Sequence, residues 1–135
     1  MRAVSVTVCV GIAGALGAIS RFAVGAALEP IVGEALFPAA TLLCNWSGSF
    51  ALGFATAGGA SRLGLSETGK TAVTSGFIGS FTTFSALSKE MTFMLQNGEA
   101  AKAFAYLALS LWGGLLLARL GGKAAETAGG GGREA

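Results

Sequence analysis

The sequence predicts an all-α membrane protein with four transmembrane helices. Of the 135 residues, 53% are hydrophobic and only 12% are charged, and the mean hydropathy is +0.67. Water-soluble domains carry about twice that share of charge. Four stretches hold no charged residue, at residues 3–20, 35–61, 71–88 and 103–118. Since a spanning helix needs about 20 mostly apolar residues, we expect residues 1–121 to form one four-helix unit.

The composition also excludes several classes of protein. Histidine is absent, and the two cysteines, Cys9 and Cys44, fall in separate apolar stretches. Catalysis by histidine, zinc-finger spacing and a secreted disulfide framework are therefore excluded, and we do not expect an enzyme. The net charge of +2 is too small, and the basic residues too scattered, to indicate a nucleic-acid partner.

The first helix is expected to start after Arg2 and to continue past Arg21 to residue 28, where Glu29 and Pro30 stop it. Its apolar stretch is longer than the roughly 7–15 residues of a signal peptide core, so we expect the helix to be retained in the mature protein.

The second helix is expected to begin near Pro38, a residue suited to a first helical turn, and to end near residue 57. Thr41, Asn45 and Ser49 recur every four residues within it, which places them on one face. Such groups serve either as hydrogen-bonding contacts between helices or as the lining of a pore, and their spacing does not decide between the two.

The third helix is expected to start after Lys70 and to end near Gln96. Residues 75–85 read Ser-Gly-Phe-Ile-Gly-Ser-Phe-Thr-Thr-Phe-Ser, a poor sequence for a regular helix because glycine and threonine lower helix propensity. A break near the bilayer midplane would free carbonyl and amide groups to bind an ion. The alternative is an unbroken helix whose hydroxyls bond to its own carbonyls.

The fourth helix is expected to cover residues 103–120, with Tyr106 and Ser110 on one face. Residues 122–135 include four consecutive glycines and cannot form a core, so a disordered C-terminal tail is predicted there.

Four spans place both ends of the chain on one side of the membrane. Six of the nine basic residues fall on that side, which favours cytoplasmic termini and a multi-pass protein of the cell membrane, such as a bacterial inner membrane, in contact with lipid. The asymmetry also predicts a preferred orientation.

The motif at residues 76–85, together with Arg21 in the first helix and residues 41–45 in the second, resembles the fluoride ion channels of the Fluc/CrcB family. The resemblance covers about residues 3–120. It implies a fluoride-selective channel subunit that exports fluoride. It also implies subunits that pair antiparallel, form two pores and hold a structural sodium ion where the broken third helices meet.

The resemblance also assigns residues by position. Arg21 resembles a vestibule arginine, Glu90 the acid that follows the break, and the backbone carbonyls of Gly79 and Thr82 the sodium ligands. The residues implied to line the fluoride pore are Thr41, Asn45, Phe84, Ser85, Tyr106 and Ser110.

Two positions depart from the family pattern. Ala86 and Leu87 stand where the pattern has a pore threonine and a second pore phenylalanine. With the asymmetry of basic residues, this departure suggests a subunit that joins a paralogous partner in an antiparallel heterodimer, with one pore weakened or non-conducting. An antiparallel homodimer stays open.

Two other functions compete with a channel. A small four-helix transporter that couples cargo to protons needs a titratable acid deep in a span, whereas Glu90 is expected at a helix end. A non-transporting scaffold subunit would use the polar faces only for packing.

Overall fold

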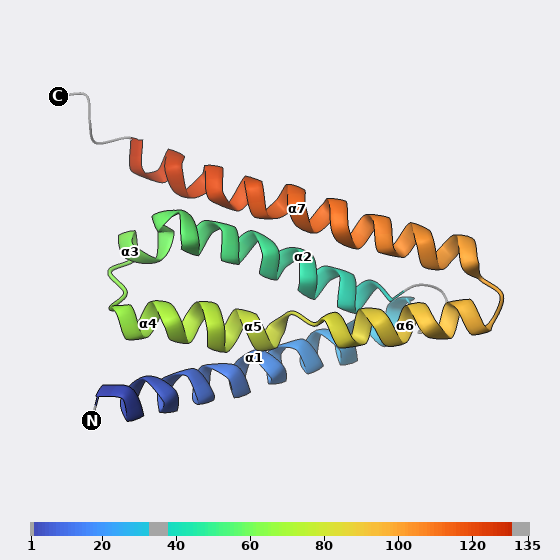
Figure 1. Ribbon diagram of the computed structural model, residues 1–135, viewed down its shortest axis with the longest axis horizontal. Helices are drawn as coiled ribbons and strands as arrows, with labels where there is room; N and C mark the ends of the chain where they lie inside the picture. The colour runs from blue at the N-terminus through green and yellow to red at the C-terminus, as the bar shows by residue number, and fades with distance from the viewer. Residues whose placement is uncertain (1, 33–37, 131–135) are drawn as a thin grey trace.

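The computed structural model describes residues 2–32 and 38–130, and this part of the chain is helical with no strand (Figure 1). The all-α prediction is confirmed. The elements form four antiparallel rows, and the start of α1 and the end of α7 lie at the same end of the bundle (Figure 1). In chain order they are α1 (Arg2–Val32), α2 (Ala39–Phe54), the π-helix η1 (Ala55–Gly59), α3 (Ala60–Arg62), α4 (Glu67–Thr71), the π-helix η2 (Ala72–Ile78), α5 (Gly79–Phe81), α6 (Phe84–Gln96) and α7 (Ala100–Gly130).

Two of the rows contain an uninterrupted helix long and apolar enough to cross a membrane. These segments are Ser5–Ile31 in α1 and Ala100–Ala128 in α7. At 1.5 Å per residue each exceeds the roughly 30 Å of a hydrocarbon core. The two rows between them are divided into shorter helical pieces, so length alone does not mark them as spans.

The first row is longer than predicted, because α1 includes Pro30 and ends at Val32. A proline removes one backbone hydrogen bond and disturbs the preceding turn. So close to the end of the helix that loss affects little remaining structure, which is why Pro30 does not end α1 at residue 28.

The second row has a kink where the sequence predicts its end, and the short α3 (Ala60–Arg62) follows the kink. Ala57 and Gly58 leave helical geometry, with φ of 99° at Gly58. Residues other than glycine rarely adopt this left-handed conformation.

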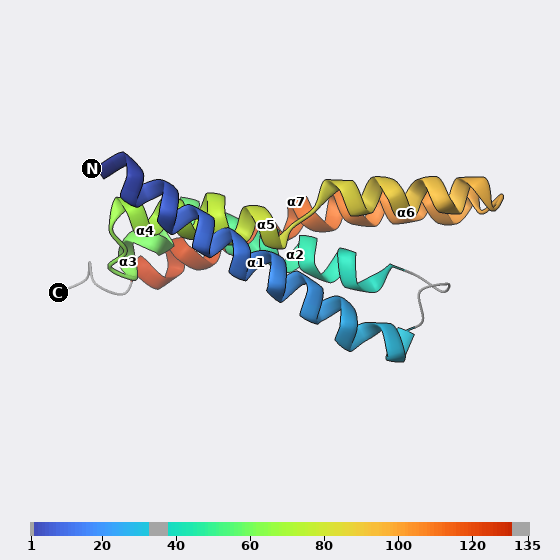
Figure 2. The same cartoon turned by 90° about the horizontal axis from the view of Figure 1, so that it is seen from below.

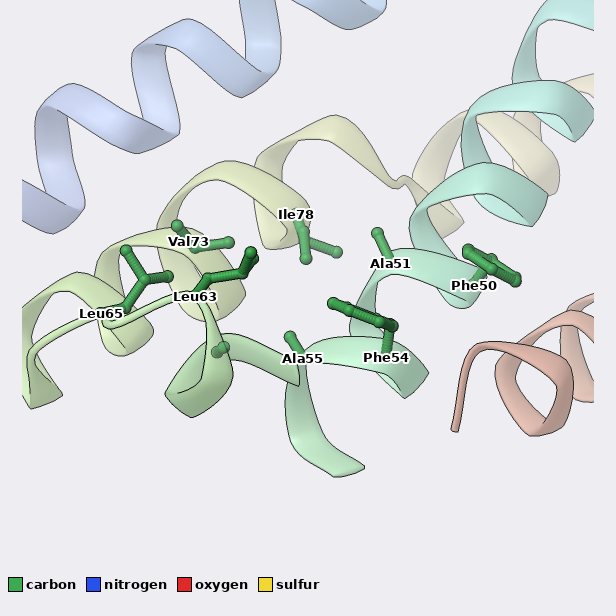
Figure 3. Close-up of a pocket in the computed structure, with 9 residues that line it drawn as sticks. Phe50, Ala51, Phe54, Ala55, Leu63, Leu65, Val73 and Ile78 are labelled. Atoms are coloured by element: carbon green, nitrogen blue, oxygen red, sulfur yellow. The ribbon is translucent and has the colours of Figure 1, made fainter. Parts of the chain in front are cut away.

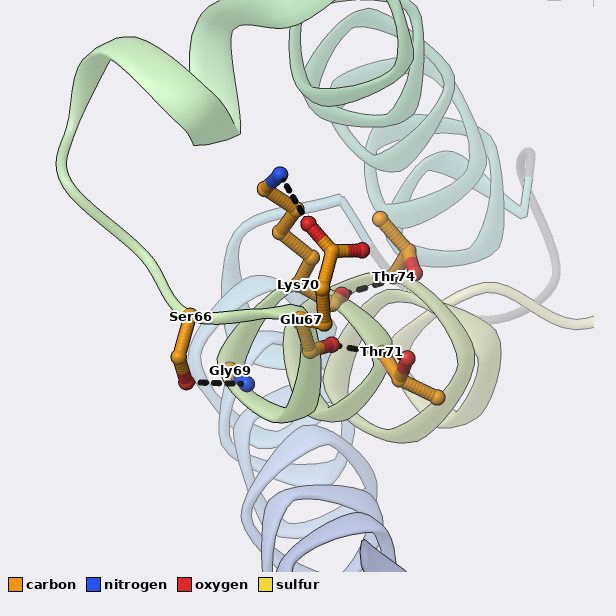
Figure 4. Close-up of polar contacts among 6 residues, drawn as sticks. All are labelled: Ser66, Glu67, Gly69, Lys70, Thr71 and Thr74. Atoms are coloured by element: carbon orange, nitrogen blue, oxygen red, sulfur yellow. Dashed lines mark hydrogen bonds and ion pairs between the residues drawn. The ribbon is translucent and has the colours of Figure 1, made fainter.

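The third row begins at Glu67, earlier than predicted, because Ser66 caps it. The Ser66 hydroxyl accepts a hydrogen bond from the Gly69 amide at 3.2 Å (Figure 4). Glu67 pairs with Lys70 across the first turn, and the Thr71 hydroxyl donates to the Glu67 carbonyl (Figure 4). These contacts fix the start of the row.

The third row is interrupted between α5 and α6. Thr82 (φ −81°, ψ 157°) and Thr83 (φ −152°, ψ 131°) are extended, and α6 starts at Phe84. The Thr83 hydroxyl caps α6 by accepting a bond from the Ala86 amide at 3.2 Å. We call Thr82 and Thr83 the break; its depth in a bilayer stays a prediction.

The fourth row corrects the predicted tail. α7 continues to Gly130, so residues 122–130 are helical and not disordered, while 131–135 lie outside the described residues. The alanine-rich segment after Gly122 favours a helix, and Ala125 is fully buried. Propensity and packing together extend the helix past the glycine pair that was expected to end it.

The rows approach closely where glycines face backbone. A Cβ atom at Gly17 of α1 would collide with the Phe77 carbonyl of η2, and one at Gly53 of α2 would collide with the Ala118 carbonyl of α7. Membrane helices commonly use small residues in this way. The α1–η2 and α2–α7 contacts thus depend on glycine, which has no side chain, at these two positions.

The described residues bury a small core and leave many apolar side chains uncovered. Leu42, Leu87, Met94 and Ala103 cluster around Tyr106, which is fully buried. Phe22, Phe84 and Trp112 are each more than 70% exposed. Figure 2 shows the C-terminal half of α1 diverging from α6. A surface this apolar suits lipid or a second subunit.

Candidate functional site

Asn45 on α2 is bound to the break. Its Nδ2 donates to the Thr83 carbonyl at 2.9 Å, and its Oδ1 accepts from the Thr83 amide at 2.7 Å. A residue between two helices leaves its backbone groups without helical partners, and buried backbone groups need partners. One amide side chain satisfies both groups of Thr83, so α2 holds the downstream half of the break.

Glu90 joins two other predicted site residues. The Thr41 hydroxyl donates to its Oε1 and the Tyr106 hydroxyl to its Oε2, each at 2.6 Å. Short bonds of this kind are typical of hydroxyls that donate to a carboxylate. The carboxylate therefore connects α2, α6 and α7 through its two oxygens.

The position of Glu90 corrects the sequence interpretation. It was expected at a helix end, but it is half-buried at the middle of α6 (Phe84–Gln96). The uncharged stretch ends at residue 88, whereas the helix continues to residue 96. The chain therefore has an acid inside a helix, and a proton-coupled transporter is no longer excluded on the ground that such an acid is missing.

Ser110 lies one turn beyond Tyr106 on α7. Its hydroxyl oxygen is buried and has no hydrogen-bond partner among the described residues. Nearby, the Trp46 indole donates to the Leu109 carbonyl at 3.1 Å and ties α2 to this part of α7. A buried hydroxyl without a partner is unfavourable unless something outside the chain supplies one.

The helical turn before the break, α5, is bound to α1. Arg21 Nε donates to the Ser80 carbonyl at 3.2 Å, and the Thr82 amide and hydroxyl both donate to the Ile78 carbonyl. None of these three bonds ends on the carbonyl oxygen of Gly79 or Thr82. These are the two carbonyls that the sequence resemblance assigns to sodium.

The described residues include no group of three His, Cys, Asp or Glu side chains that could hold a metal. A cation here would therefore depend on backbone carbonyls. Oxygen ligands suit hard cations such as sodium, and rings of carbonyls can replace a cation's hydration shell. The two carbonyls at the break have the right donor chemistry.

The predicted pore residues fall into two groups. An inner group, Thr41, Asn45, Tyr106 and Ser110, comes from the facing sides of α2 and α7. An outer group, Phe84 and Ser85, starts α6 on the exposed surface, where Phe84 is 76% exposed. Within one chain Thr41 and Tyr106 meet at Glu90, Asn45 binds the break, and the Ser110 hydroxyl is buried. The second group faces outward.

An apolar cavity of about 270 Å³ lies apart from these polar residues (Figure 3). Its walls are α2, η1, α3, η2 and the connection between α3 and α4. Its lining comprises Phe50, Ala51, Phe54, Ala55, Ala60, Leu63, Leu65, Val73 and Ile78. Figure 3 shows only carbon side chains around it. A desolvated ion would find no partner there, so the cavity does not belong to the candidate site.

Sequence reasoning missed two features of the site. Thr83 was only one member of the motif, yet its backbone binds Asn45 and its hydroxyl caps α6. A threonine directly before a helical segment is a common N-cap, so the sequence could have indicated that Thr83 caps α6. The sequence could not indicate that Arg21 binds Ser80, because the acceptor is a backbone carbonyl and every residue has one.

Comparison with known proteins gives the same family as the motif. The family model described as CrcB-like protein, Camphor Resistance (CrcB), matches residues 8–122. The fluoride-specific ion channel FluC 2 of Geobacillus kaustophilus is 43% identical over 121 residues, which cover 90% of this chain and 93% of the relative. FluC 1 of Bacillus anthracis is 42% identical over 84% of this chain and 82% of its own length. A fluoride channel family is a family of membrane proteins and not a class of enzymes. By sequence match and by motif, this chain belongs to the CrcB-like family.

Proposed function

We propose that this chain is a subunit of a fluoride-selective ion channel. The relatives named as fluoride-specific channels support this function. The observation that carries it is a set of polar groups on three rows of an otherwise apolar chain: Asn45 bound at the break, the bonded pair Glu90 and Tyr106, and the unpartnered hydroxyl of Ser110.

These groups suit a small, strongly hydrated anion. A pore must replace the lost water with hydrogen-bond donors and still let the ion leave. The Ser110 hydroxyl has no recorded partner. The Asn45 amide uses one of its two N–H groups on Thr83 and retains the other. Donors of this kind attract fluoride without the strong binding that a free arginine would give.

Phe84 contributes through pairing of subunits. An aromatic edge carries partial positive charge, so it can attract an anion that lies in the plane of the ring. In the single chain the ring faces outward. We propose an antiparallel dimer, with a second copy or a paralogous subunit, in which Phe84 and Ser85 border the fluoride path.

A structural sodium ion at the centre of this dimer forms part of the proposal. Two carbonyls from each chain, those of Gly79 and Thr82, would surround it. The carbonyls would replace the ion's hydration shell, and its fixed charge would raise the concentration of anions nearby.

The proposed location is the bacterial inner membrane, crossed by all four rows, with fluoride leaving the cell. The common end of α1 and α7 supports an even number of passes (Figure 1). The excess of basic residues toward that end supports cytoplasmic termini.

A proton-coupled transporter is the second candidate, because Glu90 provides a half-buried acid inside α6. A transporter of this kind would move cargo only with a pH gradient. A channel would pass fluoride along its own gradient without one. A non-conducting heterodimer partner is the third candidate.

The test is fluoride efflux from lipid vesicles that hold the purified chain, recorded with a fluoride electrode at equal pH inside and outside. We expect rapid fluoride release and no chloride release under the same gradient. Release only after a pH gradient is imposed would favour the transporter. Release only after a paralogous subunit is added would identify a heterodimer, and equal chloride release would overturn selectivity.

A further inference from the structure

We infer that Arg21 is a positioning residue that holds the helical turn upstream of the break through the Ser80 carbonyl. The resemblance gives this arginine the role of an anion-attracting charge in a vestibule. The structure instead uses its Nε–H as a hydrogen-bond donor to the backbone. The flux readout below rests on the proposed function; the exchange readout does not.

The location of Arg21 favours this role over interaction with lipid headgroups. It lies well inside α1 (Arg2–Val32) and is half-buried. Its partner Ser80 is 59 positions away along the chain and lies in the last helical turn before the break. A charged side chain within a span needs such a partner.

The α1–η2 contact fixes where the guanidinium lies. Gly17, one turn before Arg21, is buried against the Phe77 carbonyl, with no room for a side chain. One residue before Phe77, a Cβ atom at Gly76 would meet the Val10 carbonyl of α1. The contacts thus advance in the same direction along α1 and along η2, and the next turn of α1 after Gly17 brings Arg21 to Ser80.

The electrostatics at this point also favour a cation. Residues 67–81 are helical up to the break, so their last carbonyls form the negative end of a helix. A positive side chain that donates to one of these carbonyls is a recognised way to cap such an end.

Arg21 and Asn45 hold opposite sides of the break from different helices. Arg21 binds Ser80 from α1, and Asn45 binds Thr83 from α2. The carbonyls of Gly79 and Thr82 lie next to these anchors and receive neither bond. Arg21 thereby sets the direction of the carbonyls proposed to face sodium without contacting an ion.

The test separates the hydrogen bond from the charge. In Arg21→Gln the amide nitrogen occupies the same position along the side chain as Nε, so the variant keeps a donor and loses the charge. Arg21→Met has similar length and neither property. Arg21→Lys keeps the charge and has no donor at that position.

We expect Arg21→Gln to keep wild-type fluoride efflux within a few-fold and Arg21→Met to lose about tenfold or more, the scale of a charge-assisted hydrogen bond. Equal loss in the Gln and Met variants would overturn the inference, and so would wild-type flux in both. If the Lys variant alone keeps its flux, Arg21 acts through charge.

Amide hydrogen exchange of the peptide covering residues 79–86 gives a readout that needs no transport. Exchange at Thr82 and Thr83 is expected to be about tenfold faster in Arg21→Met and unchanged in Arg21→Gln. If the wild-type chain passes no fluoride but this exchange pattern appears, the proposed function fails and the positioning role stands. If Arg21→Met fails to fold while Arg21→Gln folds, the result also supports a role for the hydrogen-bond donor. Identical exchange rates in the two variants overturn that role.

Discussion

At the scale of single residues, Asn45 uses both ends of its amide on one partner, the backbone of Thr83. Replacing it with leucine leaves a partly buried N–H and C=O without partners, so we expect Asn45→Leu to lower the free energy of unfolding by about 1–3 kcal/mol. Fluoride efflux should fall at least tenfold, because the break loses its downstream anchor and the path loses a donor.

Ser47→Ala is the matched control for Asn45→Leu. Ser47 lies on the same helix, is exposed, and donates only to the carbonyls of Leu43 and Cys44 in its own helix. Its loss should change stability by less than about 0.5 kcal/mol and leave efflux intact. Unaltered efflux in Asn45→Leu would show that the amide serves only packing.

The Tyr106–Glu90 bond can be measured by a double-mutant cycle. Tyr106→Phe removes the donor to a half-buried carboxylate and should reduce the free energy of unfolding by about 1–3 kcal/mol. In a Glu90→Met background the same change should matter less by about 1 kcal/mol or more. Chemical denaturation of the four proteins in mild detergent gives these values; additive effects would contradict the bond.

The sequence predicted several of these residues and none of their partners. Four-residue spacing placed Thr41 and Asn45 on one face of α2, and Tyr106 and Ser110 on one face of α7. Spacing within a helix says nothing about the facing helix. The packing of the rows determines these partners. It brings Thr41 and Tyr106 to Glu90, and it brings Arg21 to Ser80.

At the scale of elements, the α1–η2 contact requires a glycine at residue 17. We expect Gly17→Ala to lower the free energy of unfolding by more than about 2 kcal/mol, because its new methyl group meets the rigid Phe77 carbonyl. Gly11→Ala in the same helix meets open space and should raise it by up to about 1 kcal/mol. Thermal unfolding checks the pair, and equal effects would contradict the close approach.

The two caps of the third row should differ in their effect on function. Ser66→Ala and Thr83→Ala each remove a capping hydroxyl and should each lower stability by about 1 kcal/mol. Only Thr83→Ala acts at the break, so only this variant should reduce fluoride efflux. Thr83→Ser should restore it, and a loss of efflux in Ser66→Ala would show that stability alone sets the flux.

Helix ends were predicted where local chemistry decides them and missed where packing does. Gly58 interrupts the second row near residue 57 because its φ is positive. The pair Gly121–Gly122 did not end α7, since Gly121 faces the Phe50 backbone with no room for a side chain and Ala125 is buried beyond it. Composition alone treats a packing glycine and a helix-ending glycine alike.

At the scale of the whole molecule, the distribution of charge should fix the orientation of the chain. Lys70 and Lys102 are paired with neighbouring glutamates at opposite ends. Arg62, Arg119 and Lys123 lie toward the end of the bundle where α1 starts and α7 ends. We expect single cysteines at Ser61 and Asn97, in a background without Cys9 and Cys44, to be labelled by an impermeant reagent from opposite sides only.

Equal labelling of both positions from both sides would contradict that orientation and would indicate an antiparallel homodimer. Single-sided labelling would mean that an antiparallel pair needs a second, oppositely inserted subunit. The exposed Ser61 and Asn97 are suitable positions because neither side chain belongs to the candidate site.

The uncovered aromatic rings of Phe84 and Trp112 bear on how cells must produce this protein. In a subunit without its partner these rings would stay exposed to proteases and chaperones, which remove chains with exposed apolar surfaces. The lifetime of the subunit would then depend on the amount of partner subunit. If two genes encode the pair, their translation must be balanced, and overproduction of either one alone would yield degraded product and no additional resistance to fluoride.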